Sequence, residues 1–371
     1  MTWSDGTREC FGPGGDFSAA IEINDEATLW SALVNNGSVG LGASYIEGSW
    51  STLDLAGFLE VASINVDSRR TSAVGRTMLA FVRRWWDRRP IGAKSTPIGE
   101  IGEHYNLGND FYASWLDESM TYSSALFSAA SDSLEVAQEA KYQRLCELLD
   151  LRAGDRVLEI GCGWGGFAEY ATTRFGVHLT GLTLSVEMAS FARERLAKVG
   201  MSHMSDIRVQ DFRDETQIFD KVVSIEMIES IPADTWPELF ETIHRVLAPE
   251  GRLAMQAILI DDRFYSGLVQ RSEFIKTYIF PGGDLPSQRA LEELSSGAEL
   301  QWVEAAHHGG DYARTLALWT ERFEEGWDRI QSSNPEFDVR FQRMWRYYLA
   351  YCEAGFRTGR LDGIQVLMER R

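Results

Sequence analysis

The sequence predicts an α/β protein whose larger domain is built on a doubly wound, mostly parallel sheet, and three observations lead to this prediction. Five short apolar runs between residues 157 and 260 have the length and composition of buried strands. Helical patterns separate these runs, and such an alternation is typical of a parallel sheet with helices on both faces. A glycine-rich turn directly follows the first run, at the edge where folds of this kind bind ligands.

The predicted elements follow one another in a simple order along the chain. Residues 1–90 are predicted to form a small N-terminal domain, with helical patterns at 26–35 and 73–84 and a glycine-rich turn at 38–50. Proline and glycine punctuate residues 90–99, which are interpreted as a linker to a second domain at 91–371. Residues 264–351 are predicted to be mostly helical. The predicted strands are 157–161, 177–184, 207–211, 221–227 and 252–260.

The composition limits the classes of function. The chain has 371 residues, 44% of them hydrophobic, which suffices for two domains or for one domain with an extension. Its formal net charge of −19 argues against a nucleic-acid substrate, because proteins that bind nucleic acids usually carry a basic surface. The absence of a CxxC pair argues against a disulfide framework and against a metal site. The four cysteines are Cys10, Cys146, Cys162 and Cys352.

The same features bear on location. The N-terminal residues have neither a basic start nor an apolar run, so no signal peptide is expected. No stretch approaches the roughly 20 apolar residues that a membrane-spanning helix needs. A cytoplasmic location is therefore predicted, with peripheral contact to the inner face of the membrane. The segment RRWWDRRP at 83–90 is a candidate for docking on anionic lipid, and a solvated helix end packed on the main domain is the alternative.

The strongest motif is the turn after the first predicted strand, RVLEIGCGWGG at 156–166. Glu159 lies near the end of the apolar run, and Gly161, Gly163 and Gly165 let the backbone turn sharply and lie against a ligand. A lone GxGxG is a weak signal, because dinucleotide-binding proteins use a related device. The acid precedes the first glycine by two residues, which suits the ammonium of an amino acid better than a ribose hydroxyl.

Two further segments follow the next two predicted strands. GLTLS at 181–185 places Thr183 where the second strand ends beside a ribose. After the third strand, Asp211 and Phe212 offer an acceptor and a ring for adenine. Together with the glycine turn, these segments resemble the class I fold of S-adenosylmethionine-dependent methyltransferases. A glycine-rich turn that binds no ligand is the alternative interpretation.

A second set of motifs lies on both sides of the predicted strands. HYNLGNDFY at 104–112 and SMTYSSA at 119–125 lie upstream. EMIE at 226–229, YIFPGG at 278–283, Asp311-Tyr312 and YYLAYC at 347–352 lie further along. In this order, over about residues 95–360, they resemble the cyclopropane-fatty-acid synthase family, which includes the mycolic acid cyclopropane synthases. GLGASYIEGSW at 40–50 is similar to the smaller N-terminal domain of the bacterial members.

The resemblance implies transfer of a one-carbon unit from the sulfonium of S-adenosylmethionine to a cis double bond in a phospholipid acyl chain, within a channel capped by helices. It places Glu229, Tyr312 and the backbone near Ile258 at the family's bicarbonate-binding positions. It also matches Cys352 to a cysteine that the family is credited with using. The implied cofactor-binding residues are Tyr122, Ser123, Glu159, Gly161, Gly163, Gly165, Thr183, Asp211 and Phe212.

Several positions depart from the family's pattern. Ser124 stands where the motif has cysteine, and Gln256 stands where a histidine that holds bicarbonate is common. Ser230 replaces the histidine of the usual EH pair, and Met188 replaces a frequent glutamine after GLTLS. Bicarbonate binding, and with it ring closure, is therefore left open, whereas methyl transfer is not affected. The candidate catalytic residues are Glu229, Tyr312, Gln256, Ser124 and Cys352.

The predicted chemistry needs a dry site lined by aromatic rings. An alkene is a poor nucleophile, so the site must hold it in line with the sulfonium methyl. Attack leaves a positive charge on the neighbouring carbon, which aromatic faces and a carboxylate such as Glu229 stabilise. Loss of a proton from the new methyl closes a cyclopropane, and loss from an adjacent chain carbon gives a methylene or methyl-bearing alkene. The candidate rings are Tyr122, Phe280, Tyr312, Tyr347 and Tyr348.

A methyl-branched or methylene product is preferred over a plain cyclopropane, because Gln256 can hydrogen-bond but cannot carry the charge of a histidine. An inactive lipid-binding or scaffold subunit and a small-molecule methyltransferase are the alternatives from other classes. Unsaturated phospholipid acyl chains at the membrane surface are the expected partners, and a homodimer and a partner reductase or oxidase are left open. His104 is either a packing residue of a helix or part of the site.

Overall fold

A computed structural model describes residues 1–10, 18–67, 107–268 and 274–371 of the chain. The chain divides into two compact units, each continuous in space but not in sequence. The helical unit comprises residues 1–106, 270–281 and 324–359, and the sheet unit comprises residues 107–269, 282–323 and 360–371. The contacts group residues 270–281 and 324–359 with the N-terminal residues. The predicted domain boundary between residues 90 and 91 lies outside the described residues and stays a prediction. The expected helix at 73–84, the segment 83–90, the linker at 90–99 and His104 lie outside the described residues.

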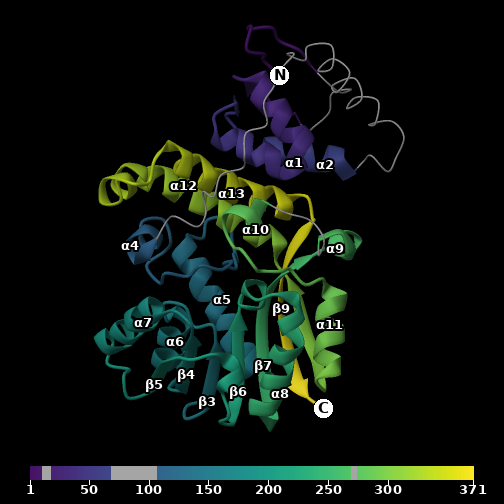
Figure 1. Cartoon of the computed structure of the whole chain (residues 1–371). Helices are drawn as coiled ribbons and strands as arrows, with labels where there is room; N and C mark the ends of the chain where they lie inside the picture. Colours follow the sequence, from purple (N-terminus) through teal and green to yellow (C-terminus); the bar gives the residue numbers. More distant parts are fainter. Residues whose placement is uncertain (11–17, 68–106, 269–273) are drawn as a thin grey trace. The chain divides into compact units, whose positions relative to one another are not determined.

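The sheet unit is organised around a seven-stranded sheet of order β5-β4-β3-β6-β7-β9-β8. Strands β3 to β7 pair in parallel, and β9 is antiparallel to both of its neighbours. This arrangement confirms the predicted α/β class with a doubly wound, mostly parallel sheet (Figure 1). The strands are β3 Arg156–Ile160, β4 His178–Thr183, β5 Ser205–Val209, β6 Phe219–Ile225, β7 Leu247–Ile260, β8 Leu300–His307 and β9 Leu361–Arg370.

The stretch 264–351 is mostly helical, as predicted, but β8 interrupts it, and β9 was not predicted. Both strands complete the sheet by antiparallel pairing, β9 with β7 and β8 with β9. Five of the eight residues of β8 are exposed to solvent, so its sequence lacks the continuous apolar run that marks a buried parallel strand. The partner of β9 lies more than a hundred residues earlier in the chain, and a local pattern does not reveal such pairing.

Helices cover both faces of this sheet, as a doubly wound fold requires. Helices α5, α6 and α7 share a buried cluster with one face, and α8 and α11 share a second cluster with the other (Figure 1). The helices of the unit are α4 Gly108–Ala113, α5 Leu134–Leu149, α6 Gly166–Phe175, α7 Val186–Lys198, α8 Trp236–Val246, α9 Asp262–Leu268, α11 Gln288–Gly297 and the first part of α12 Gly309–Ser333. The short 3-10 helices are η3 Phe212–Asp214, η4 Ile228–Ser230 and η5 Ala233–Thr235.

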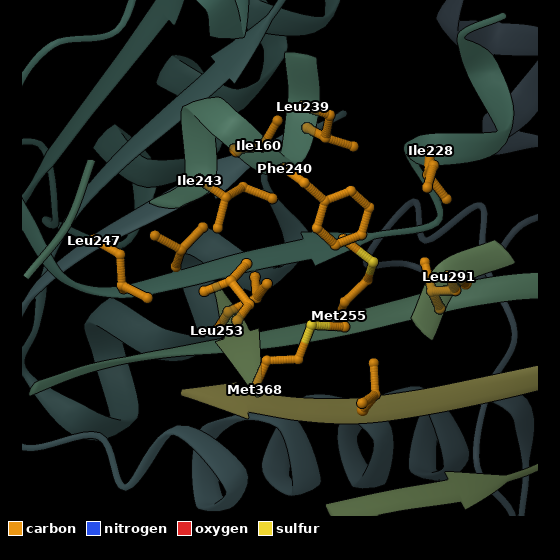
Figure 2. Packing of buried hydrophobic residues seen from close by; sticks show 14 of the residues in the cluster. Ile160, Ile228, Leu239, Phe240, Ile243, Leu247, Leu253, Met255, Leu291 and Met368 are labelled. Carbon is orange, nitrogen blue, oxygen red and sulfur yellow. The ribbon is translucent and has the colours of Figure 1, made fainter. Parts of the chain in front are cut away.

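The packing between α8 and the sheet shows to which face the side chains of β7 point. Figure 2 shows Phe240 and Ile243 of α8 beside Leu253 and Met255 of β7, all within one buried cluster. Each such side chain stabilises the fold by about 1.5–3 kcal/mol when it is fully buried. Because successive side chains of a strand point to opposite faces, the neighbouring Ala254 belongs to the other cluster, with α5.

This alternation determines where polar groups of the sheet can meet. Gln256 has the same orientation as Ala254, so it faces the α5 side, and it pairs across the sheet with Gln365 of β9. On β3, Val157 belongs to the α5 cluster, and Glu159, two residues further, points the same way. The fold therefore directs a glutamine and a carboxylate to one face, near the carboxyl ends of their strands.

In the helical unit, the predicted glycine-rich turn at 38–50 is instead largely helical. Helix α1 continues to Ile46 after a kink at Gly37, whose φ is 55°. A Cβ atom on Gly42 would lie 2.4 Å from the ring of Phe274 and 2.9 Å from that of Tyr347. Gly42 therefore permits close packing of helices rather than a turn. The unit's elements are β1 Glu22–Ile23, α1 Glu26–Ile46, β2 Trp50–Ser51, α2 Leu55–Asp67, α10 Phe274–Tyr278, the end of α12 and α13 Val339–Arg357.

Candidate active site

The glycine turn after β3 has the backbone conformation that its sequence predicts. Gly161, Gly163 and Gly165 have φ values of 85°, 49° and 79°, in the left-handed region that side chains disfavour. A Cβ atom on Gly161 would lie 2.7 Å from the side chain of Met227, whereas one on Gly163 would meet no atom within 4 Å. The turn is thus tightly packed at its start and open at its centre, where a ligand can lie against the backbone.

Glu159 provides the charge that such a ligand would meet. Its side chain is 2% exposed, and its Oε2 atom has no hydrogen-bond partner. Burial raises the pKa of Glu159 well above its ordinary value, and the nearby Lys141 opposes this effect. A buried carboxylate oxygen without a donor is costly, and the ammonium group of an amino acid would satisfy it. The residues present therefore fit S-adenosylmethionine, whose methionyl part carries that ammonium.

The other predicted cofactor residues of the sheet lie at the ends of the two neighbouring strands. Thr183 ends β4, and its carbonyl accepts a hydrogen bond from Gln210 N at 3.1 Å, which joins the two strand ends. Asp211 caps η3, and its two oxygens accept from the guanidinium of Arg213 at 3.0 and 2.7 Å. A carboxylate can accept about four hydrogen bonds, so Asp211 keeps capacity for an adenine amino group. Phe212 packs partly buried beside it.

The segment before α5 forms a fixed loop over the glycine turn. Met120 has a φ of 56°, and the side chain of Asp117 accepts from the backbone N–H of Ser119 at 3.0 Å and of Thr121 at 3.2 Å. The hydroxyl of Thr121 lies 2.5 Å from that of Tyr142 on α5. These contacts hold the following residues, 122–124, in one orientation.

Ser123 is fixed by hydrogen bonds from two side chains of α5. Gln138 Nε2 donates to the carbonyl of Ser123 at 3.0 Å, and Lys141 Nζ donates to its hydroxyl at 2.6 Å. Lys141 has no exposed surface. Burial lowers its pKa to about 7, although the carboxylates of Glu226 and Glu159 favour the charged form. Sequence reasoning gave Lys141 no role, because a single lysine in a helical pattern predicts a solvent-exposed face.

Glu226 is the centre of a hydrogen-bond cluster at the end of β6. Its Oε1 atom accepts from Ser124 N at 2.9 Å and from Gln256 Nε2 at 2.8 Å. Its Oε2 atom accepts from the Tyr312 hydroxyl at 2.7 Å. Gln256 is oriented in turn by Gln365, whose Nε2 donates to Gln256 Oε1 at 2.8 Å. Three of the predicted catalytic residues, Ser124, Gln256 and Tyr312, therefore lie together. All three donate hydrogen bonds to the Glu226 carboxylate.

The backbone of Glu226 departs from ordinary geometry. Its φ is 51°, in the left-handed region, which costs about 1–2 kcal/mol for a residue with a side chain. The backbone N–H of Glu226 donates to the carbonyl of Gln256 at 2.8 Å, which holds the strained residue at the sheet edge. Strain that the surrounding structure maintains is frequent at functional sites. The sequence contained one signal for this residue, an acid directly after a buried strand and three positions before Glu229.

Glu229 lies in η4 beside this cluster. Its Oε1 atom accepts from the backbone N–H of Ile258, and its buried Oε2 atom has no hydrogen-bond partner. Burial and the charge of Glu226 raise the pKa of Glu229 to about 8. Burial also raises the pKa of Glu226, but three hydrogen bonds and Lys141 oppose that effect. The proton shared by this pair therefore belongs on Glu229, and Glu226 is the ionised member.

This geometry does not fit bicarbonate at the position that the resemblance implied. Ser124 N, Gln256 Nε2 and the Tyr312 hydroxyl donate to Glu226, and Ile258 N donates to Glu229. The donors expected around bicarbonate are thus already paired with side-chain carboxylates. We therefore assign no step to bicarbonate.

Aromatic rings extend from the glycine turn to this cluster. The ring of Trp164, within the turn, lies 4.9 Å from that of Tyr112, which lies 5.5 Å from Tyr122. Trp319 lies 5.4 Å from Tyr122 and 6.5 Å from Tyr312. Tyr122 and Tyr312 were predicted for this role, whereas Trp319 was not.

The remaining candidates lie in the other unit of the chain. Phe280 follows α10, and Tyr347, Tyr348 and Cys352 lie on α13. All four belong to the helical unit, where the ring of Tyr347 packs 4.6 Å from that of Phe274. Cys352 is half-buried. Their predicted roles stay predictions.

The strand order, the glycine turn and the buried acid beside it define a class I S-adenosylmethionine-dependent methyltransferase. More particularly, the chain belongs to the mycolic acid cyclopropane synthetase family, whose family model matches residues 93–366. It is 36% identical over 375 residues to a tuberculostearic acid methyltransferase of Mycobacterium tuberculosis, covering 98% of this chain and 86% of that protein. It is 34% identical over 365 residues to the cyclopropane-fatty-acyl-phospholipid synthase of Escherichia coli, covering 95% and 91%.

Solved structures agree with this assignment. The cyclopropane synthase structure from Mycobacterium tuberculosis superposes with a TM-score of 0.66 at 29% identity, over 72% of this chain and 96% of that one. A mycolic acid cyclopropane synthase complexed with S-adenosylhomocysteine superposes with a TM-score of 0.67 at 26% identity, over 73% and 97%. The predicted family, fold, enzyme class and cofactor, S-adenosylmethionine, are thereby confirmed.

Proposed function

We propose that this enzyme transfers the methyl group of S-adenosylmethionine to a cis double bond of an unsaturated phospholipid acyl chain and forms a methyl-branched or methylene product. The observation that carries this proposal is the carboxylate of Glu226, held where sequence resemblance had implied bicarbonate. A buried carboxylate beside aromatic rings can direct positive charge and accept a proton. The similarity to a tuberculostearic acid methyltransferase over nearly the whole chain supports the same assignment.

Each group of residues has a separate role in the proposed reaction. The glycine turn and Glu159 hold the methionyl part of the donor, which supplies an electrophilic methyl group. Tyr122, Trp319 and Tyr312 present ring faces to the positive charge that develops on the acyl chain, each worth about 0.5–2 kcal/mol where water is excluded. Glu226 then takes a proton from a carbon next to the charged one. Loss from the chain carbon that carries the methyl group gives a methyl-bearing alkene. A methylene forms when a hydride first shifts from that carbon to the charged carbon, after which the proton leaves the methyl group. The C–H electron pair forms the new double bond, and the proton stays on the carboxylate.

The arrangement explains why Glu226 rather than Glu229 is the base. Three donors and the ammonium of Lys141 stabilise the ionised form of Glu226. Glu229 receives one backbone hydrogen bond and faces a neighbouring negative charge. A general base must be ionised at the working pH, and its geometry must be set in advance.

The substrate determines where the enzyme must work. Within the described residues, no helix combines the length and the apolar character that crossing a bilayer requires. An acyl chain of a phospholipid is embedded in the membrane, so the proposal includes peripheral contact with its surface. A methylene product becomes a methyl branch only on reduction, and a partner reductase belongs to the same proposal.

Cyclopropanation is the second candidate, because the chain is 34% identical to a cyclopropane-fatty-acyl-phospholipid synthase over 95% of its length. Purified enzyme incubated with methyl-labelled donor and vesicles of monounsaturated phospholipid separates the two products. We expect labelled fatty acids that take up hydrogen over a mild catalyst, as alkenes do, and equal incorporation in buffers with and without bicarbonate. A labelled product that resists hydrogenation would identify a ring. Binding of donor and lipid without incorporation would identify an inactive lipid-binding subunit.

A further inference from the structure

Lys141 is a buried cation that the steps above do not use directly. It lies on α5, has no exposed surface, and donates from Nζ to the hydroxyl of Ser123 at 2.6 Å. Its ammonium also lies 4.9 Å from the ring centroid of the neighbouring Tyr142. A charged ammonium in such a place costs several kcal/mol unless opposite charges compensate it.

The charges that act on Lys141 come from several elements. Glu159 of β3, Glu226 after β6 and Asp117 of the loop before α5 favour its ammonium form. His308, at the junction of β8 and α12, is a further titratable group that interacts with Lys141, and burial keeps its imidazole neutral. Three carboxylates thus share one cation. In the proposed function, Glu159 binds the donor and Glu226 is the base.

Lys141 is also connected to the proposed base, Glu226, through hydrogen bonds of two neighbouring residues. It fixes the hydroxyl of Ser123, and the next residue, Ser124, donates its N–H to Glu226 at 2.9 Å. Gln138, one turn earlier on α5, supports the carbonyl of the same Ser123 at 3.0 Å but carries no charge. The two residues therefore offer a natural comparison between support with charge and support without it.

We propose that Lys141 is a positioning residue of the reaction, whose ammonium orients Ser123 and Ser124 toward Glu226 and keeps both Glu226 and Glu159 ionised. This inference rests on the proposed function for the role of Glu226, whereas the role toward Glu159 concerns donor binding alone. Removing the cation would favour the neutral form of each carboxylate. The acidic limb of the pH–rate profile would then move to higher pH, because Glu226 acts only when ionised.

The experiment compares the full-length variants Lys141→Met, Lys141→Arg and Gln138→Met with the wild type. Initial rates of methyl transfer are measured from pH 5 to 9, and donor binding is measured by calorimetry at the same pH values. We expect the acidic limb of Lys141→Met to lie about one pH unit higher than that of the wild type. We expect Gln138→Met to lower the rate by one factor at all pH values and Lys141→Arg to keep the wild-type limb.

A Lys141→Met profile that differs from the wild type only in height would overturn the inference, and so would an equal shift in Gln138→Met. If Lys141→Met does not fold, Lys141→Arg decides, because a displaced limb in that variant contradicts a role for charge. If the wild type transfers no methyl group, the proposed function fails while the inference stays testable. Donor binding by Lys141→Met must then weaken more at pH 6 than at pH 8, since a neutral Glu159 cannot pair with the donor's ammonium.

Discussion

Replacing Glu226 by glycine would separate the carboxylate from the backbone conformation that carries it. The residue has a φ of 51°, a value that glycine adopts freely and that costs other residues about 1–2 kcal/mol. A glycine loses about 0.5–1 kcal/mol more conformational entropy on folding, so the two backbone terms nearly cancel. Backbone effects therefore leave the variant close to the wild type in stability.

The side-chain terms also oppose each other. The substitution removes a buried carboxylate, but it leaves Ser124 N, Gln256 Nε2 and the Tyr312 hydroxyl without their acceptor. An unpaired buried donor costs about 1–3 kcal/mol, and water in the vacated polar space would recover much of that cost. We therefore expect a folded variant whose free energy of unfolding differs from that of the wild type by about 2 kcal/mol or less.

The effect on activity is expected to be much larger. Loss of a positioned general base lowers a rate by about 10²–10⁴-fold. In Glu226→Gly the three donors that lose the carboxylate would be able to bind a small anion. Added bicarbonate or formate should therefore restore part of the rate. Glu226→Gln is the matched control, because its amide fills the same space and leaves no room for the anion.

Methyl incorporation into monounsaturated phospholipid measures all three variants, with and without the anions, and thermal unfolding measures their stability. Two results would refute the reasoning. One is a Glu226→Gly enzyme that keeps more than about a tenth of the wild-type rate, a smaller loss than the removal of a general base produces. The other is a wild-type enzyme that itself requires bicarbonate.

Two further predictions concern stability. Gly42→Ala should destabilise the helical unit by about 1–3 kcal/mol, because the new methyl group would lie 2.4 Å from the ring of Phe274. Gly297→Ala is the control, because a Cβ atom at this position of α11 would have no neighbour within 4 Å. It should be neutral or stabilising by up to about 1 kcal/mol in thermal unfolding. Equal losses of stability in both variants would contradict the packing argument. The folded pKa of Glu229, about 8, exceeds its ordinary value of 4.5, so the folded state holds a proton that the unfolded chain has released. This contribution to stability is complete below pH 4.5 and is lost as the pH rises to about 8, with a slope of about 1.4 kcal/mol per pH unit. Glu229→Gln should lack this slope in urea unfolding at pH 6, 7 and 8, and parallel pH dependences would show that Glu229 is already ionised.

Local patterns in the sequence were sufficient for the fold class and for the prediction of a donor site. Apolar runs with the length of strands predicted β3 to β7, because burial between two helical layers leaves a continuous apolar signature. The acid and three glycines after β3 predicted the donor site, because both requirements, a charge and a left-handed backbone, are met by neighbouring residues. The glycines at 40 and 42 were misjudged because the same residue type also allows helices to pack closely.

The sequence by itself determined the class of sheet, the family and the conformation of the glycine turn, because each depends on residues close together in the chain. Only the tertiary structure decided which carboxylate accepts hydrogen bonds from Gln256 and Tyr312. Successive members of this cluster are 30 and 56 positions apart in sequence. Parallel pairing of β6 and β7 brings Glu226 beside Gln256, and α12 brings Tyr312 to them. The same holds for Lys141, whose burial beneath Ser123 follows from the packing of α5 on the sheet. Long-range packing determines which side chains surround Glu226 and Lys141, and a local sequence pattern does not reveal these neighbours. The neighbours in turn determine the pKa of each charged group.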